Sequence, residues 1–265
     1  MNDNVTPALV LGRYDAAHLL AMFTETGAIA AVEKRGFSQI ACELDGSSGT
    51  LVHTRLLACK DGRRHQLLDA CLTELHLEPG GPITSGYRVD APTDLLVVYW
   101  LREQDPTAHF DAAHTRLPLQ EHPGLGVLRR GFQVAVRIAK ELGKDGIAAL
   151  PKFFHDAAIF YHSRLFLFLD PRVQGRLEAL LRDLHDLSLA DATLALVGDA
   201  VHDRDGAVVR WSPELQILPI SPALTEAFHS QAYQDASTRA LETSHFTWDA
   251  AALATARSVF ESQDI

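Results

Sequence analysis

The sequence predicts an α/β fold in which a mixed central sheet is flanked by helices. Segments with strand and helix periodicity alternate between residues 95 and 170, in the order strand, glycine loop, helix, strand, helix, strand. The segment after the glycine loop has the clearest helical periodicity of the chain. With 265 residues, of which 47% are hydrophobic and 22% charged, the chain is long enough to bury a sizeable core.

The helix after the glycine loop is predicted by apolar residues spaced three and four apart. These residues are Leu125, Leu128, Phe132, Ala135, Ala139 and Leu142. Such spacing places them on one face of a 3.6-residue helix, while polar and charged residues, among them Gln133, take other positions. Gly143 is a natural stop for this helix. An apolar strand at 95–101 precedes the loop, and a strand at 146–150 and a helix at 153–161 follow the helix.

Upstream, the pattern predicts a helix over residues 16–35, with a possible break at Gly27. Strands are expected at 37–44 and 51–59, joined by turn residues at 45–49, and a hairpin turn at 60–63 follows. Residues 65–77 alternate like a strand, although part of the segment also fits a helical face. We favour the strand and leave the helix open.

After residue 170 the sequence predicts a C-terminal helix-hairpin-helix extension over residues 171–265, appended to a domain of residues 1–170. An amphipathic helix is expected at 173–184. Residues 193–201 and 207–218 are expected to form a hairpin around the turn at 203–206. Helical patches at 226–233 and 248–260 complete the extension.

Charge and composition narrow the classes of partner. The formal net charge is −10, which disfavours general binding to nucleic acid or to anionic membranes but allows a small anionic ligand in a local basic pocket. The cysteines Cys42, Cys59 and Cys71 lack the spacing of a zinc site. Without a signal-like N-terminus or a run of membrane-spanning length, we expect a soluble, cytoplasmic protein.

The glycine loop is the first candidate for a binding site. Gly124 and Gly126 carry no side chain, so a ligand could approach the backbone there. Free N–H groups at a helix start and the positive end of the helix dipole favour a phosphate. The candidate residues are Gly124, Leu125, Gly126, Val127, Leu128, Arg129 and Arg130. The alternative is that the glycines only form a tight turn.

These segments resemble the N-acetyltransferase superfamily called GNAT over about residues 16–170. The family's loop motif is Gln or Arg, two residues, Gly, any residue, then Gly or Ala. Gly124-Leu125-Gly126 matches the glycines, while Glu121 stands at the first position and Gln120 lies one place early. The family's second signature is a helix reading Asn, Ala and Tyr, followed by a strand opening with Gly-Phe.

In that second signature, Ala157 and Tyr161 match, and Leu165-Phe166 stands where the family has Gly-Phe. Phe154 replaces the family's Asn, and Leu165 replaces its Gly. The chain is therefore similar to a divergent GNAT member.

The resemblance implies transfer of an acyl group from acetyl-CoA or another acyl-CoA to a small-molecule or peptide amine, and a homodimer is possible. It implies that the loop at 124–130 holds the pyrophosphate of the donor and that Tyr161 protonates the departing thiolate. Glu103, just beyond the central strand, is the best placed carboxylate for a base. His122 and His155 could serve instead, because imidazole titrates near neutral pH.

Two other functions stay open. The loop from His109 to His122 also contains Asp111 and His114, and such groups, with His155, can bind zinc or iron. The set matches no complete metal motif, so we expect no metal. The departures at Glu121 and Leu165 also allow a non-catalytic GNAT-like domain that binds a partner or an unusual ligand.

Overall fold

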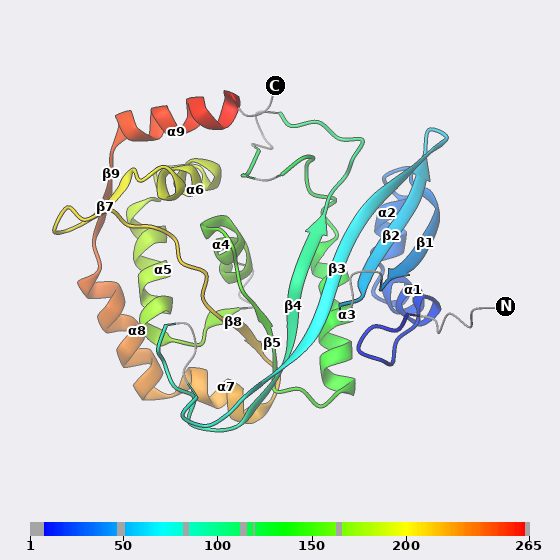
Figure 1. Ribbon diagram of the computed structural model, residues 1–265, viewed down its shortest axis with the longest axis horizontal. Coiled ribbons are helices and arrows are strands. Elements are labelled where there is room, and N and C mark those ends of the chain that lie inside the picture. Colours follow the sequence, from blue (N-terminus) through cyan, green and yellow to red (C-terminus); the bar gives the residue numbers. More distant parts are fainter. Residues whose placement is uncertain are drawn as a thin grey trace. The chain divides into compact units, whose positions relative to one another are not determined.

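The computed structural model describes residues 8–46, 51–81, 85–111, 116–118, 120–162 and 166–262. It confirms a mixed α/β fold with helices flanking the sheet (Figure 1). The larger sheet has seven strands in the order β1-β2-β3-β4-β5-β8-β6, and β7 pairs with β9 in a second sheet.

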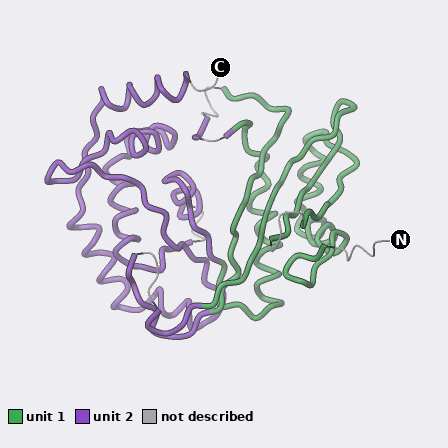
Figure 2. Tube along the Cα trace, in the orientation of Figure 1, with its two compact units in different colours: residues 1–76, 94–114, 121–147 green, residues 77–93, 115–120, 148–265 purple. Residues whose placement is uncertain are grey.

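The chain divides into two compact units (Figure 2). Unit 1 contains residues 1–76, 94–114 and 121–147, and unit 2 contains residues 77–93, 115–120 and 148–265. The sequence-based domain boundary at residue 170 stays a prediction. None of the helices in the described part of the chain is long and apolar enough to cross a membrane.

Unit 1 begins with two short helices, α1 (Ala16–Glu25) and α2 (Ala28–Glu33). The break between them is the one predicted at Gly27, whose φ of +74° lies in the left-handed region that glycine adopts without strain. Asp15 caps α1, because its side chain accepts a hydrogen bond from the amide of His18 at 2.7 Å.

Four long strands follow α2: β1 (Ser38–Asp45), β2 (His53–Lys60), β3 (Arg63–Leu77) and β4 (Thr93–Glu103). β2 pairs antiparallel with β1 and with β3, and the β2–β3 register runs from Lys60 opposite Arg63 to His53 opposite Cys71. The predicted hairpin turn is present. Residues 63–77 form a strand, so the helical alternative for this segment is wrong. The predicted turn at 45–49 lies partly outside the described residues.

The helix after the glycine loop is α3 (Leu128–Glu141), and β5 (Gly146–Ala149) follows it. α3 buries Phe132, Val134, Ala135, Ile138 and Ala139, so the predicted apolar face is largely confirmed. The helix begins three residues after Leu125, the first residue of the apolar pattern. Leu125 is buried, but it belongs to the loop that precedes the helix.

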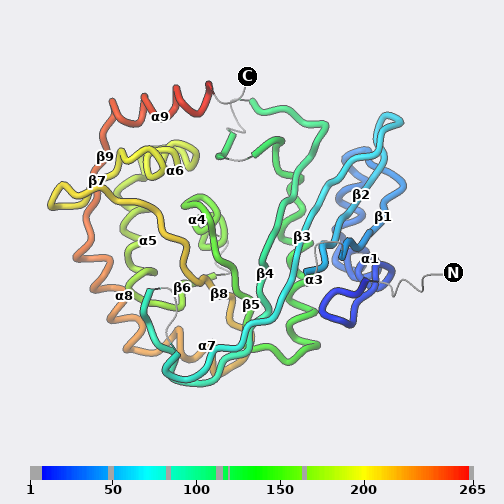
Figure 3. The backbone as a smooth tube through the Cα atoms, in the orientation of Figure 1, coloured from blue at the N-terminus to red at the C-terminus, as the bar shows by residue number. Residues whose placement is uncertain are grey.

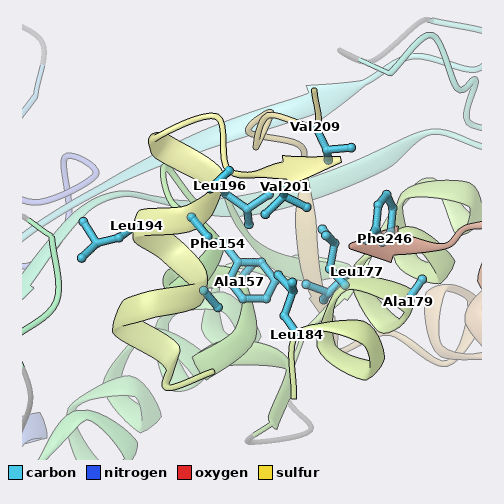
Figure 4. Packing of buried hydrophobic residues seen from close by; sticks show 14 of the residues in the cluster. Phe154, Ala157, Leu177, Ala179, Leu184, Leu194, Leu196, Val201, Val209 and Phe246 are labelled. Atoms are coloured by element: carbon cyan, nitrogen blue, oxygen red, sulfur yellow. The ribbon is translucent and has the colours of Figure 1, made fainter. Parts of the chain in front are cut away.

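Unit 2 is built around a core of helices and short strands, part of which is shown in Figure 4. Its first elements are α4 (Phe154–His162), β6 (Leu167–Phe168) and α5 (Pro171–Asp183). Asp170 caps α5, and Pro171 occupies the first helical position, where a missing N–H has no cost. Buried side chains of α4 and α5, such as Phe154, Leu177 and Leu180, pack into one cluster.

The predicted hairpin over residues 193–218 is not confirmed, and its first strand is wrong where residues 193–197 are helical. Residues 189–197 form the helix α6 (Leu189–Val197), β7 (Val201–Asp203) pairs with β9 (Phe246–Trp248), and β8 (Gln216–Pro219) pairs with β6 in the larger sheet. The chain does reverse at the predicted turn 203–206, and His202 lies opposite Val208 in an isolated bridge. The amide of Asp203 donates to the carbonyl of Ala207 at 3.0 Å, and the amide of Val209 donates to the carbonyl of Val201 at 2.8 Å. The expected helix-hairpin-helix extension is therefore not confirmed.

Among the described residues after β8, three further helices follow: α7 (Pro222–His229), α8 (Gln231–Thr243) and α9 (Ala250–Ser262). Ser230 ends α7 and also caps α8, so the first predicted patch, 226–233, spans parts of two helices. Figure 3 follows this path from α7 through α8 and β9 to α9. α8 packs along α5, where Gly175 lies close to Ala240.

Candidate functional site

The end of β4 and the start of α3 form the candidate site of unit 1. Glu103 is the last residue of β4, and its Oε1 accepts a hydrogen bond from the amide of Val127 at 2.9 Å. The amide of Gly126 also donates to this carboxylate. A side chain of the strand therefore already binds two amides that precede α3. The buried Oε2 of Glu103 has no hydrogen-bond partner among the described residues.

Burial raises the pKa of the Glu103 carboxyl above its ordinary value. The amides of Val127 and Gly126 and the positive charge of Arg35 oppose this effect without cancelling it. A carboxylate with a raised pKa is a stronger base than an exposed glutamate, and bases work best when their pKa lies near the working pH. Glu103 is therefore suited to accept a proton.

Two buried side chains of the glycine loop hold it against the rest of unit 1. Leu125 and Val127 pack in a cluster with residues of α2, β2, β3 and the segment before β1. The cluster contains Val32, Phe37, Ala58, Leu67, Leu125 and Val127. Because Leu125 and Val127 point inward, the glycines beside them, Gly124 and Gly126, stand exposed.

An arginine that the sequence analysis did not consider lies beside Gly126. A Cβ atom added at Gly126 would approach the Nη2 of Arg35 to 2.7 Å, and Gly126 has a φ of +70°. The Nη1 of Arg35 is 3.8 Å from the Oδ2 of the buried Asp105. The amide of Asp105 in turn donates to the carbonyl of Pro123 at 2.8 Å. The guanidinium is thus held next to the exposed glycine backbone.

Arg129 and Arg130 are exposed in the first turn of α3. The side chain of Arg130 extends to Gly27, because a Cβ atom added there would lie 3.9 Å from Cδ and Nε of Arg130. Val127 at the helix cap provides no side-chain hydrogen bond to the first turn. Unit 1 therefore brings the exposed glycines together with basic side chains at a helix N-terminus, which favours an anion.

The other candidate site residues are divided between the two units. His122 lies half-buried in the loop of unit 1, whereas His155 and Tyr161 belong to α4 of unit 2. His155 is 6% exposed, stacks on Phe153 with ring centroids 5.4 Å apart and lies 3.3 Å from the Oδ1 of Asp156. Burial lowers the pKa of His155. It is therefore held mainly in the neutral form.

Tyr161 forms part of a side-chain network in unit 2. Its hydroxyl donates a hydrogen bond to the Oε1 of Glu178 at 3.0 Å, and Nε2 of Gln174 donates to the same oxygen at 2.9 Å. Its ring packs against the core cluster that contains Phe154 and Leu177. The tyrosine thus has a packing role beside the predicted chemical one, and its role as an acid stays a prediction.

No group of three or more histidine, cysteine or acidic side chains in the described ranges could hold a metal ion. His114, which belongs to the alternative metal set, lies outside those ranges.

A comparison with protein-family models found no match, and a comparison with curated proteins found no similar sequence. The resemblance to the GNAT superfamily therefore depends on the residues of this chain.

Proposed function

We propose that the protein is an acyl-CoA-dependent N-acyltransferase whose glycine loop binds the pyrophosphate of the donor. The observation that carries the proposal is the exposed guanidinium of Arg35 beside Gly126. With Arg129 and Arg130 in the adjoining helical turn, it gives an acidic chain a local basic surface at a helix N-terminus. Phosphate groups are favoured at such a position by N–H groups, by the helix dipole and by guanidinium charge.

Glu103 is the proposed base of the transfer. It accepts a proton from the acceptor amine, whose nitrogen then forms a bond to the carbonyl carbon of the thioester. The carbon–sulfur bond breaks, and the thiolate leaves with a proton, for which Tyr161 is the predicted source. The raised pKa of the Glu103 carboxyl supports this role.

The contacts of Glu103 also indicate which donors remain for the phosphates. Because the amides of Gly126 and Val127 bind Glu103, the pyrophosphate is expected to use the first turn of α3 and the arginines. Hydrogen bonds from charged groups contribute about 1.5–3 kcal/mol each. Removing both Arg129 and Arg130 should therefore weaken CoA binding by at least about 100-fold.

Calorimetric titration with CoA tests the proposal. The double variant Arg129→Ala/Arg130→Ala keeps the loop backbone and removes two exposed charges. Arg239→Ala is the matched control, because Arg239 is exposed on α8 in unit 2. We expect CoA binding by the wild type and the control and a large loss in the double variant. Absence of CoA binding by the wild type would refute the donor site.

A further inference from the structure

Unit 1 contains an apolar cavity of about 50 Å³ beside the candidate site. Its walls come from α1, β2, β3, β4 and α3, including Leu19, Phe23, Leu68 and Ile138. Most of the lining surface is apolar, and Glu103 is the only ionisable residue in the lining as described. The hydroxyl of Thr54 is the other side-chain polar group there.

The carboxyl of Glu103 has an unsatisfied acceptor. Its Oε1 is bound to the amide of Val127, whereas its buried Oε2 has no partner among the described residues. A buried water usually makes about three hydrogen bonds, and an apolar cavity with few polar groups holds water poorly. The lining offers the carboxyl and the hydroxyl of Thr54, so a ligand with one polar end fits it better than water does.

The volume limits the size of such a ligand. One water-sized group needs about 10–15 Å³ of such a cavity, so about 50 Å³ accommodates roughly three to five non-hydrogen atoms. The negative charge of the Glu103 carboxylate favours a hydrogen-bond donor that carries positive charge. A short carbon chain would occupy the apolar remainder of the cavity.

We propose that this cavity binds a small aliphatic primary amine, with its nitrogen at Oε2 of Glu103 and its carbon chain between α1, α3 and the strands. The inference that this amine is the acyl acceptor depends on the proposed transferase function. The binding itself does not, because it needs neither donor nor turnover.

Calorimetric titration of the protein with butylamine, in the absence of CoA, tests the proposal. Butylamine has five non-hydrogen atoms, and 1-butanol has the same size without the charge. We expect saturable binding of butylamine and binding of 1-butanol that is at least about 10-fold weaker, the factor typical of a charge-assisted hydrogen bond. Hexylamine exceeds the volume and should bind less tightly than butylamine.

Paired variants locate the amine. Glu103→Gln keeps the shape and an acceptor for Val127 and should weaken butylamine binding by about 10–100-fold, whereas Glu121→Gln, in the exposed loop, should not. Ala135→Leu fills the cavity from α3 and should abolish binding, whereas Gln133→Leu on the exposed face of the same helix should not. Ala70→Val fills it from β3 if Ala135→Leu does not fold.

The outcomes separate this inference from the donor site. Butylamine binding without CoA binding would support amine binding in the cavity and would refute the inference that the amine is an acyl acceptor. CoA binding without saturable butylamine binding would overturn the inference and leave the donor site intact. Equal binding by the wild type and a folded cavity-filling variant, or a single ordered water in place of the amine, would also overturn it.

Discussion

The close packing of α5 on α8 predicts a large effect of a single added carbon at Gly175. A Cβ atom built there would lie 2.7 Å from the Cβ of Ala240 and 2.8 Å from the amide nitrogen of Leu241, and it would also meet the carbonyl oxygen of Ser237. Two of these three atoms belong to the backbone of α8. They cannot turn away as the end of a flexible side chain can, so α5 and α8 would have to move apart.

The magnitude follows from two opposing contributions. Replacing glycine by alanine inside a helix stabilises it by about 1 kcal/mol. Overpacking typically costs about 1–3 kcal/mol, and the backbone contacts place Gly175→Ala at the upper end. The net loss is about 2 kcal/mol, or a decrease in Tm of roughly 4–8 °C for a chain of this size.

Gly131→Ala in α3 is the matched control. Its Cβ would lie 3.8 Å from the Cε1 of Phe23, an ordinary contact, so the helical gain remains. We expect its Tm to increase by roughly 2–4 °C. Thermal unfolding followed by circular dichroism measures both variants. A Gly175→Ala protein as stable as Gly131→Ala would show that the two helices are not packed this closely.

Two further predictions concern the proposed catalytic groups. Because burial raises the pKa of Glu103 in the folded state, the folded protein holds this proton more tightly than the unfolded chain, and stability falls as pH rises from about 4.3 through the raised pKa. Urea unfolding at several pH values should therefore show Glu103→Gln gaining on the wild type over this window, and a pH-independent difference would contradict the raised pKa. Tyr161→Phe removes the hydrogen bond to Glu178, so we expect a loss of about 1–2 kcal/mol in unfolding free energy. If Tyr161 is the acid, turnover with an identified acceptor should also fall by roughly 100-fold, whereas wild-type turnover would leave the hydroxyl a structural role alone.

The sequence predicted most elements up to residue 162, because their apolar residues follow a clear period. It failed at α6, where residues 190, 192 and 193–196 are all buried. A helix surrounded by core has no polar face, so its apolar run resembles a buried strand. The missed signal was Ser188, which accepts from the amide of Asp191 and donates to its carboxylate, as at the start of many helices.

The candidate site was predicted in part. The glycine loop and Glu103 were expected in the same region, but their spacing does not reveal that the carboxylate binds the amides of Gly126 and Val127. Arg35 was missed because it precedes the loop by a long stretch of chain. Only the shared packing of α2, the strands and the loop brings it to Gly126.

Because the carboxylate of Glu103 binds two amides of the glycine loop, binding of an anion at this loop is coupled to uptake of a proton by Glu103. An anion that displaces Glu103 from Gly126 and Val127 removes the hydrogen bonds that lower the pKa of this carboxyl, and it adds negative charge beside it. Both changes favour the protonated acid, so such an anion would enter together with a proton. An anion that contacts only the arginines and the first turn of α3 would leave those hydrogen bonds intact, and its binding would be coupled to uptake of a smaller fraction of a proton. The heat of binding would then vary with the ionisation enthalpy of the buffer in the first case far more than in the second.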